Sequence, residues 1–169
     1  AVTQVPLIYK MNKEGKQVLM GHMMKESEHY NAFTKNNKLM AVFTGPDAFV
    51  SAAWYEDKRS PATWNYMSVY VRGQISWLDE EDLDRVLMET TTHFDQANKE
   101  VAYSDIPKEL KDRLKPMIAG FEVEIEQMEG VFKLSQDKGI NDFNAVLKAL
   151  ENGTSKEMAL AAEMKKSRK

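Results

Sequence analysis

A long run rich in aromatic and β-branched residues, WNYMSVYVRGQISWL at 64–78, most limits how this chain can fold. Such a composition is typical of a β-strand, and Gly73 within it predicts a bulge or a bend. A second run, MIAGFEVEIEQMEGVFKLSQ at 117–136, has the period-two pattern of a strand. Its alternating apolar residues are Phe121, Val123 and Ile125, separated by glutamates.

Shorter runs in the first half of the chain also predict strands. KEGK, with Gly15, predicts a hairpin turn between the first two of them, and Gly45-Pro46 predicts a turn after the third. We therefore expect four or five successive antiparallel strands with one crowded face, as in a barrel or a closed sheet. These shorter runs cover residues 5–12, 16–24, 38–45 and 48–55.

Helical patterns begin after Leu78. The stretch 79–98 has an acidic first turn and an apolar stripe, which predicts an amphipathic helix. Pro116 is expected to end a short helix at 106–116, and Gly153 to cap a helix at 141–153. The apolar stripe of the first helix comprises Leu83, Val86, Leu87 and Phe94. The fold class expected is mainly β with helices, α+β.

We expect one domain over residues 1–150 and a helical, basic tail over 151–169. A chain of 169 residues is long enough to bury a sizeable core. The opening AVTQVPLIYK reads as a strand already in progress, so we expect that residues are missing upstream of this sequence.

Composition narrows the classes of function. The formal net charge of −3 disfavours a dedicated nucleic-acid binder, although the tail carries Lys165, Lys166, Arg168 and Lys169. The absence of cysteine excludes a thiolate nucleophile and fits a cytoplasmic protein. No apolar run approaches the roughly 18 residues of a membrane span.

Polar residues at a strand end form the first candidate site. Gly21, His22 and Lys25 precede a helical turn and form a candidate anion site for a phosphate. A metal site from His22, Glu26 and His29 matches no standard spacing, so polar residues at a strand end are the favoured alternative.

The segment PATWNY at 61–66 forms the second candidate. Its aromatic residues fit core or interface packing, or alternatively a platform for a planar ring whose edge Asn65 contacts. Lys133, Ser135 and Lys138 fit a solvated strand end, or residues that close over a phosphate or a carboxylate. No dinucleotide, P-loop or hydrolase motif is present, so redox chemistry would need a bound cofactor.

Three stretches, in order and spacing, resemble the PaiB family of FMN-binding split-barrel proteins, which are described as negative transcriptional regulators. They are GPDAFVSAAWY at 45–55, SPATWNYMSVYVRG at 60–73 and AGFEVEIEQMEGVFKLSQDK at 119–138. GHMMKE at 21–26 resembles the Gly-His segment of the family. The resemblance covers most of residues 3–150.

The resemblance implies a split β-barrel related to pyridoxamine-phosphate oxidase, forming a homodimer with FMN in clefts between subunits. It also implies an upstream helix and an N-terminal first strand, which are missing from this sequence. It puts the flavin phosphate near the strand that ends at Gly21 and the ring beside the segment at 3–5. Other contacts are implied from PATWNY and from the late strand. The implied cofactor-binding residues are Thr3, Gln4, Gly21, His22, Lys25, Trp64, Asn65, Lys133 and Gln136.

This chain departs from the family pattern at several positions. Ser27-Glu28 replaces the usual Asn-Pro, and Glu28 adds negative charge near the implied phosphate site. Asp47 and Tyr70 stand where histidines are usual, and Asp137 adds another acid. These changes are expected to weaken FMN binding but leave the apolar pattern of the fold intact.

Three functions therefore remain open from the sequence. The first is an FMN-binding, homodimeric regulator that acts indirectly, without direct DNA binding. The second is an FMN-dependent oxidoreductase, or a haem-binding and haem-degrading protein in which His22, His29 or His93 supplies an axial ligand. The third is a dimer that has lost its cofactor.

Overall fold

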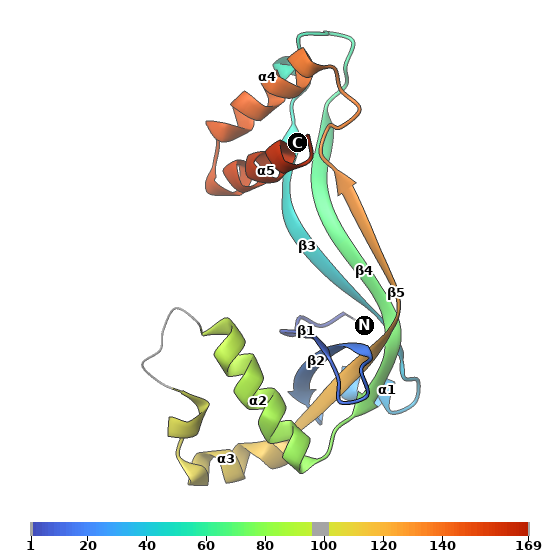
Figure 1. Ribbon diagram of the computed structural model, residues 1–169, viewed down its shortest axis with the longest axis vertical. Helices are drawn as coiled ribbons and strands as arrows, with labels where there is room; N and C mark the ends of the chain where they lie inside the picture. The colour runs from blue at the N-terminus through green and yellow to red at the C-terminus, as the bar shows by residue number, and fades with distance from the viewer. Residues whose placement is uncertain (1, 96–101, 169) are drawn as a thin grey trace. The chain divides into compact units, whose positions relative to one another are not determined.

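The computed structural model describes residues 2–95 and 102–168 and has an α+β fold (Figure 1). Its five-stranded sheet has the order β1-β2-β5-β4-β3. The strands are β1 Ile8–Met11, β2 Gln17–Met24, β3 Lys38–Val50, β4 Thr63–Trp77 and β5 Ile118–Lys133. The α-helices are α1 Glu28–Phe33, α2 Glu80–Phe94, α3 Lys108–Leu114, α4 Ile140–Glu151 and α5 Ser155–Lys166.

The chain forms two compact units, each made of two separate segments. The first unit comprises Ala1–Met40 and Val71–Gln127, and the second comprises Ala41–Tyr70 and Met128–Lys169. Strands β3, β4 and β5 each contribute residues to both units. The units therefore share strands although each has its own helices.

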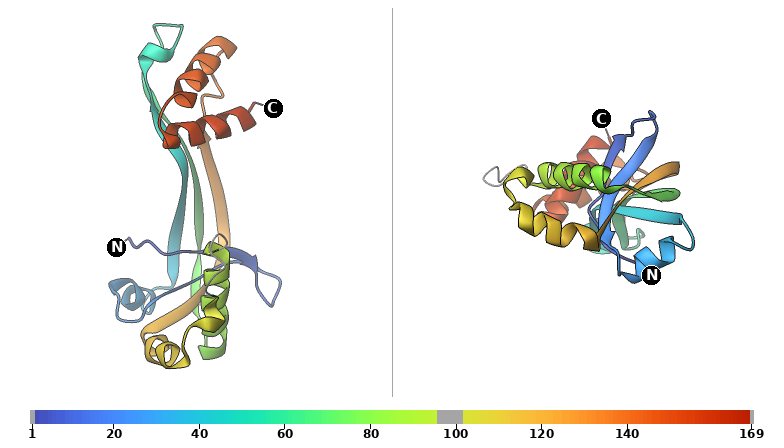
Figure 2. Two further views of the ribbon diagram at one scale, coloured as in Figure 1. Left: turned by 90° about the vertical axis from the view of Figure 1, so that its left-hand side faces the viewer. Right: turned by 90° about the horizontal axis from the view of Figure 1, so that it is seen from below.

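In the first unit, a hairpin of β1 and β2 pairs with β5 and is covered by α2 (Figure 2). Gly15 adopts φ 78° in the hairpin turn, as the KEGK pattern predicts, because glycine alone enters this region without strain. Leu83 and Val86 of α2 are buried. Arg85 of α2 also reaches Glu122 of β5, with 3.7 Å between nitrogen and oxygen.

Strands β4 and β5 approach unusually closely at Gly73. A Cβ atom at this position would lie 2.1 Å from the carbonyl oxygen of Glu124 and 2.9 Å from a methyl group of Val123. Any larger residue would force the two backbones apart. The glycine therefore sets how closely β4 lies against β5.

The second unit has its own apolar core, in which α4 and α5 pack against each other (Figure 1). Tyr55, which follows a 3-10 turn at Ala52–Trp54, is fully buried in this core. The other buried members are Ala48, Val50, Leu134, Phe143, Val146, Leu150, Leu160, Ala161 and Met164. The C-terminal helix therefore belongs to the packed interior of this unit.

Several local predictions differ from the structure. Gly45-Pro46 makes no turn but lies inside β3, which is an edge strand, where proline is tolerated. Phe94 is 58% exposed, because the buried face of α2 ends earlier, at Thr90. Asn152 caps α4, and Gly153 follows it without a positive φ. The last three residues of the helix predicted at 79–98 lie outside the described residues.

Candidate functional site

Gly21, in the middle of β2, is buried because another part of the chain lies directly over it. A Cβ atom here would come within 2.8 Å of Leu7 and 3.0 Å of the carbonyl oxygen of Pro6. The N-terminal segment therefore crosses β2 at this glycine. Thr3 and Gln4, a few residues earlier in that segment, are exposed.

His22 lies on the face of β2 that packs against α2. It pairs with Gly120 of β5, where a Cβ atom would meet Leu83 of α2 at 3.3 Å. The Nδ1 atom of His22 is buried and has no hydrogen-bond partner among the described residues. Burial lowers the pKa of this imidazole, because a charged ring would lose its hydration.

Lys25 follows the end of β2 and is exposed. Its backbone N–H donates to the carbonyl of Met117 at 2.9 Å, while no ion pair involves its ammonium group among the described residues. Ser27 then caps α1 by accepting the N–H of Tyr30 at 3.1 Å. The helical turn expected after Lys25 is thus present, and it begins at Glu28.

Trp64, in the second unit, is 49% exposed and yet fixed in place. Its indole N–H donates to a carboxylate oxygen of Asp47 at 3.0 Å, and the other oxygen of Asp47 lies 2.9 Å from Lys156 of α5. Hydrogen bonding from Lys156, followed by that from Trp64, lowers the pKa of Asp47. The ring of Phe49 lies 6.3 Å from that of Trp64.

Asn65, the next residue of β4, points into the interior and has no exposed surface. Its amide nitrogen donates to the hydroxyl of Ser135 at 2.9 Å and approaches the sulfur of Met164 at 3.7 Å. Its side-chain oxygen has no partner among the described residues. The amide of Asn65 thus links β4 to the loop after β5.

That loop is strained and its side chains are engaged locally. Ser135 has φ 59°, which is uncommon for a residue other than glycine. Gln136 accepts the N–H of Leu134 at 2.7 Å and donates to the carbonyl of Phe132 at 2.8 Å. Lys133 donates to the hydroxyl of Thr63 on β4.

The residues predicted to hold a cofactor therefore fall into two groups. Thr3, Gln4, Gly21, His22 and Lys25 lie in the first unit, whereas Trp64, Asn65, Lys133 and Gln136 lie in the second. Sequence reasoning missed how Trp64 is held. The sequence marked Asp47 only as the replacement of a usual histidine, and nothing in it marked Lys156.

The basic residues of the tail are engaged within the second unit. Lys165 pairs with Glu151, and Lys166 lies 2.7 Å from a carboxylate oxygen of Glu163. The guanidinium of Arg168 lies 4.2 Å from the centre of the Phe143 ring. These contacts leave little of the basic charge of the described tail free for another partner.

The five-stranded sheet with its α-helices has an α+β split-barrel fold, which a solved structure described below shares. A family model described as "Putative FMN-binding domain" matches residues 1–127. The chain belongs to this family, the PaiB family of FMN-binding split-barrel proteins.

Two relatives and one solved structure illustrate the similarity. "Protease synthase and sporulation protein PAI 2" of Bacillus subtilis is 29% identical over 168 residues, covering 96% of this chain and 80% of that protein. An uncharacterized protein of Aspergillus fumigatus is 29% identical over 153 residues, covering 76% of this chain and 58% of its own length. The FAD- and haem-binding protein of Mycobacterium smegmatis has a TM-score of 0.54 at 15% identity, covering 83% of this chain and 64% of that one.

Within the described ranges, no helix is long and apolar enough to cross a membrane. In the same part of the chain, no three His, Cys, Asp or Glu side chains gather as metal ligands would. His29 instead stacks on Phe33 in α1, with 5.8 Å between the ring centres.

Proposed function

We propose that this protein binds FMN as a cytoplasmic homodimer and acts as a negative regulator of the PaiB type without contacting DNA itself. The observation that carries the proposal is the match of the FMN-binding family model to residues 1–127, a span that includes the segments forming the first unit. When bound, FMN supplies one- and two-electron redox chemistry that the side chains of this protein lack.

The polar groups of the first unit fit the chemistry of FMN. Lys25 offers an exposed ammonium group for the phosphate, and no ion pair engages it among the described residues. Thr3 and Gln4 offer an exposed hydroxyl and an exposed amide, both suited to the polar edge of a flavin ring or to the ribityl chain. Gly21 contributes through packing, because Leu7 and Pro6 occupy the space over it.

In the second unit, Trp64, Lys133 and Gln136 are exposed, whereas Asn65 is buried. We assign Trp64 to stacking on a planar ring and Lys133 to an anionic group. Asn65 and Gln136 are instead assigned to supporting the backbone, because their amides already bond to Ser135, Leu134 and Phe132.

The homodimer is supported by apolar side chains that the second unit leaves exposed on its strands. Large apolar residues that stay about half exposed on neighbouring strands are typical of an interaction surface. They are Val42, Phe49, Trp64, Met128 and Phe132. The measurement is sedimentation velocity: a monomer at micromolar concentration would contradict the homodimer.

An indirect regulatory role is supported by the charges. The net charge is −3, and Lys165 and Lys166 of the tail are both paired with glutamates. A protein that bound DNA directly would need a free basic surface to contact the phosphates. Gel-shift titration at low salt checks this point, and sequence-specific retardation of duplex DNA would overturn the indirect role.

The experiment that tests FMN binding is the visible absorption spectrum of the purified protein before and after adding FMN, with haem as the control. We expect flavin bands near ~450 nm that survive gel filtration. Lys25→Ala should weaken binding, whereas Lys35→Ala, at an exposed residue after α1, should not. A protein that is colourless when purified and gains no flavin band with FMN, whether or not it gains a haem band with haem, would refute the flavin proposal.

The acidic departures from the family pattern give a second test. Glu28→Pro combined with Asp137→Asn removes two negative charges near the implied phosphate contacts, so the affinity for FMN should rise. Flavin fluorescence quenching measures the dissociation constant in both proteins. An unchanged constant would show that these acids do not limit binding.

A further inference from the structure

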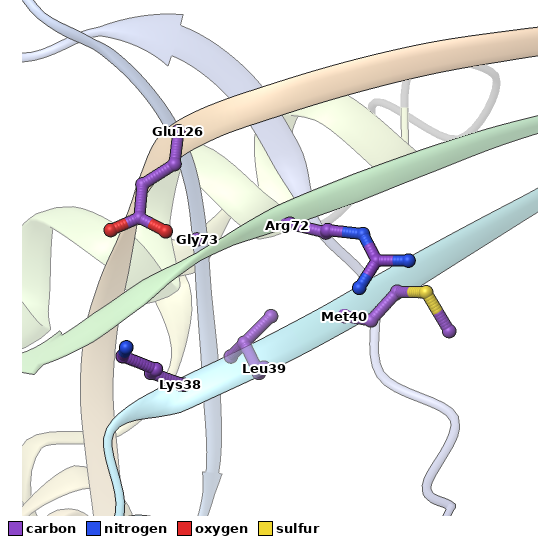
Figure 3. Close-up of a pocket in the computed structure, with 6 residues that line it drawn as sticks. All are labelled: Lys38, Leu39, Met40, Arg72, Gly73 and Glu126. Atoms are coloured by element: carbon purple, nitrogen blue, oxygen red, sulfur yellow. The ribbon is translucent and has the colours of Figure 1, made fainter.

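A cavity of about 320 Å³ opens on the first unit, and none of its lining residues is among those assigned to FMN. Figure 3 shows the residues that three strands contribute to its wall. They are Lys38, Leu39 and Met40 of β3, Arg72 and Gly73 of β4, and Glu126 of β5. This volume lies at the lower end of the range that small-molecule sites occupy, roughly 300–1,000 Å³.

Two cations of this cavity are left without a carboxylate. Among the described residues, Lys38 and Arg72 form no ion pair and their side chains form no hydrogen bond, although Glu126 lines the same cavity. Another cavity of the first unit, of about 370 Å³, is different. There, Lys13 and Arg85 both pair with Asp82, at 3.1 and 2.9 Å.

Glu126 is held by a different partner. Its carboxylate accepts a hydrogen bond from the amide of Gln74, whose own oxygen accepts from Asn37 at 3.1 Å. This chain of bonds ties the carboxylate to β4. The positive charge of Lys38 and Arg72 therefore remains available to an anion from outside the chain.

The cavity also offers an apolar contact beside its positive charge. Met40 is 53% exposed. Figure 3 shows the side chains of Met40 and Arg72 extending in the same direction from neighbouring strands. Gly73, which also lines the cavity, must remain glycine because β5 lies so close. An apolar group attached to an anion could rest on Met40 there.

We propose that this cavity binds a small organic anion, a phosphate or carboxylate carrying an apolar group. The guanidinium of Arg72 presents a planar fork of donors that matches either anion, and Lys38 adds a second positive charge. The apolar group lies against Met40. This site is separate from the proposed FMN site and does not depend on it.

The experiment is a titration of the isotope-labelled protein followed by NMR. Phenyl phosphate and benzoate are the two anionic probes, and benzyl alcohol is the neutral one. We expect the anions to shift the backbone amide signals of residues 38–40 and 72–73, and the probe that binds more tightly identifies the anion class. Equal shifts with benzyl alcohol, or no shifts with either anion, would overturn the proposal.

Variants test whether the two cations form the site. Arg72→Ala and Lys38→Ala should each lower the affinity for the anionic probe about tenfold, the usual effect of losing a hydrogen bond to a charged group. Both side chains are exposed, so folding should be retained. Lys35→Ala is the matched control, because it removes an exposed positive charge outside the cavity. If Lys35→Ala lowered the affinity for the probe by as much, the anion would be held by general charge attraction, and the proposed site would be refuted.

The FMN titration separates this site from the proposed cofactor site. Arg72→Ala should bind FMN as tightly as the parent protein does, while it loses the anionic probe. If Arg72→Ala lost FMN and the probe in parallel, the cavity would be part of the flavin site, and the claim of a second site would fall.

Discussion

Asn65 shows how much one polar residue can constrain the second unit. It is fully buried between the exposed Trp64 and the half-buried Tyr66. Its amide holds Ser135 in a left-handed conformation that serine adopts only when the surroundings impose it. The asparagine in PATWNY therefore anchors the loop after β5.

A double-mutant cycle tests this anchor. Asn65→Ala removes a buried hydrogen bond and some packing, so it should lower the free energy of unfolding by about 2–3 kcal/mol. Ser135→Ala keeps the backbone strain but removes the same bond. Urea unfolding of both single variants and of the double variant should give a coupling of about 1 kcal/mol. Strictly additive effects would show that the two side chains act independently.

Gly73 gives a sharper prediction, because any side chain at this position would clash with the backbone of β5. Gly73→Ala would put a Cβ atom 2.1 Å from the carbonyl oxygen of Glu124, so the two strands must separate. We expect a loss of at least about 2 kcal/mol of unfolding free energy, measured by urea denaturation.

The control for this variant is Gly139→Ser at the N-cap of α4. A Cβ atom at Gly139 meets nothing within 4 Å, and serine can accept an N–H of the first helical turn. The control should be as stable as the parent protein or slightly more stable. A loss as large as that of Gly73→Ala would contradict the clash as the cause.

His22 should make stability depend on pH. Burial lowers the pKa of this imidazole below its ordinary value of 6.5, so the unfolded chain binds the proton more readily than the folded protein does. The contribution of His22 to stability is therefore present above about pH 6.5 and is lost as the pH falls through the folded pKa.

The measurement compares the parent protein with His22→Gln. The difference in unfolding free energy between them should be larger at about pH 8 than at about pH 5. His29→Gln, which removes a histidine of α1, is the control for the general effect of replacing a histidine with glutamine. A difference that does not change with pH would show that His22 is not the titrating group.

At the scale of elements, α5 is the helix with the clearest start signal. Thr154 accepts the N–H of Glu157, while Glu157 accepts the N–H of Thr154 at 2.7 Å, which makes a reciprocal capping box. The carboxylate of Glu157 accepts from the backbone N–H of Thr154 and also from its hydroxyl, and these two bonds, the backbone one first, lower the pKa of Glu157. This cap fixes where the helix begins.

Removing the cap should weaken the second unit. Thr154→Ala leaves the first N–H groups of α5 without a partner, so the free energy of unfolding should fall by about 1 kcal/mol. Ser155→Ala, at the next position, is the matched control and should change it by less than about 0.5 kcal/mol. Chemical denaturation checks both, and equal losses would contradict the role of the cap.

The long strands and the amphipathic helices could be predicted from the sequence because their patterns are local. The alternation in 117–136 and the β-rich run at 64–78 correspond to β5 and β4. The turn predicted at Gly45-Pro46 was wrong because a turn and an edge strand tolerate proline equally well. Only the strand order, which is a property of the whole sheet, distinguishes a turn from an edge strand here.

The candidate site was less predictable than the fold. Residue types and family motifs indicated Thr3, Lys25 and Trp64, and all three have exposed surface. The sequence could not reveal that Asn65 is buried or that Gln136 bonds to its own turn. Such engagement depends on which segments meet in space, and local patterns carry little information about that.

At the scale of the whole molecule, the C-terminal helix should be indispensable to the second unit. Leu160, Ala161 and Met164 of α5 are buried in its core. A chain that ends at Gly153 loses all three and exposes Phe143 and the other apolar residues of α4. We expect hydrogen exchange to show that α4 has lost its protection, while α2 of the first unit keeps more of its own.

A chain that ends at Ser167 is the control for this truncation, because it keeps the whole of α5 and its three core residues. Its α4 should stay protected from exchange. Full protection of α4 in the chain that ends at Gly153 would show that α5 is dispensable.

The interleaving of the two units has a consequence for synthesis on the ribosome. Ala41–Tyr70 emerges early, but its partner segment, Met128–Lys169, is made only after α2, α3 and most of β5. Throughout that delay, the apolar side chains of Val50 and Tyr55 have no helices to cover them. We therefore expect Ala41–Tyr70 to be the part of the nascent chain most prone to misassociation until the last helices are released.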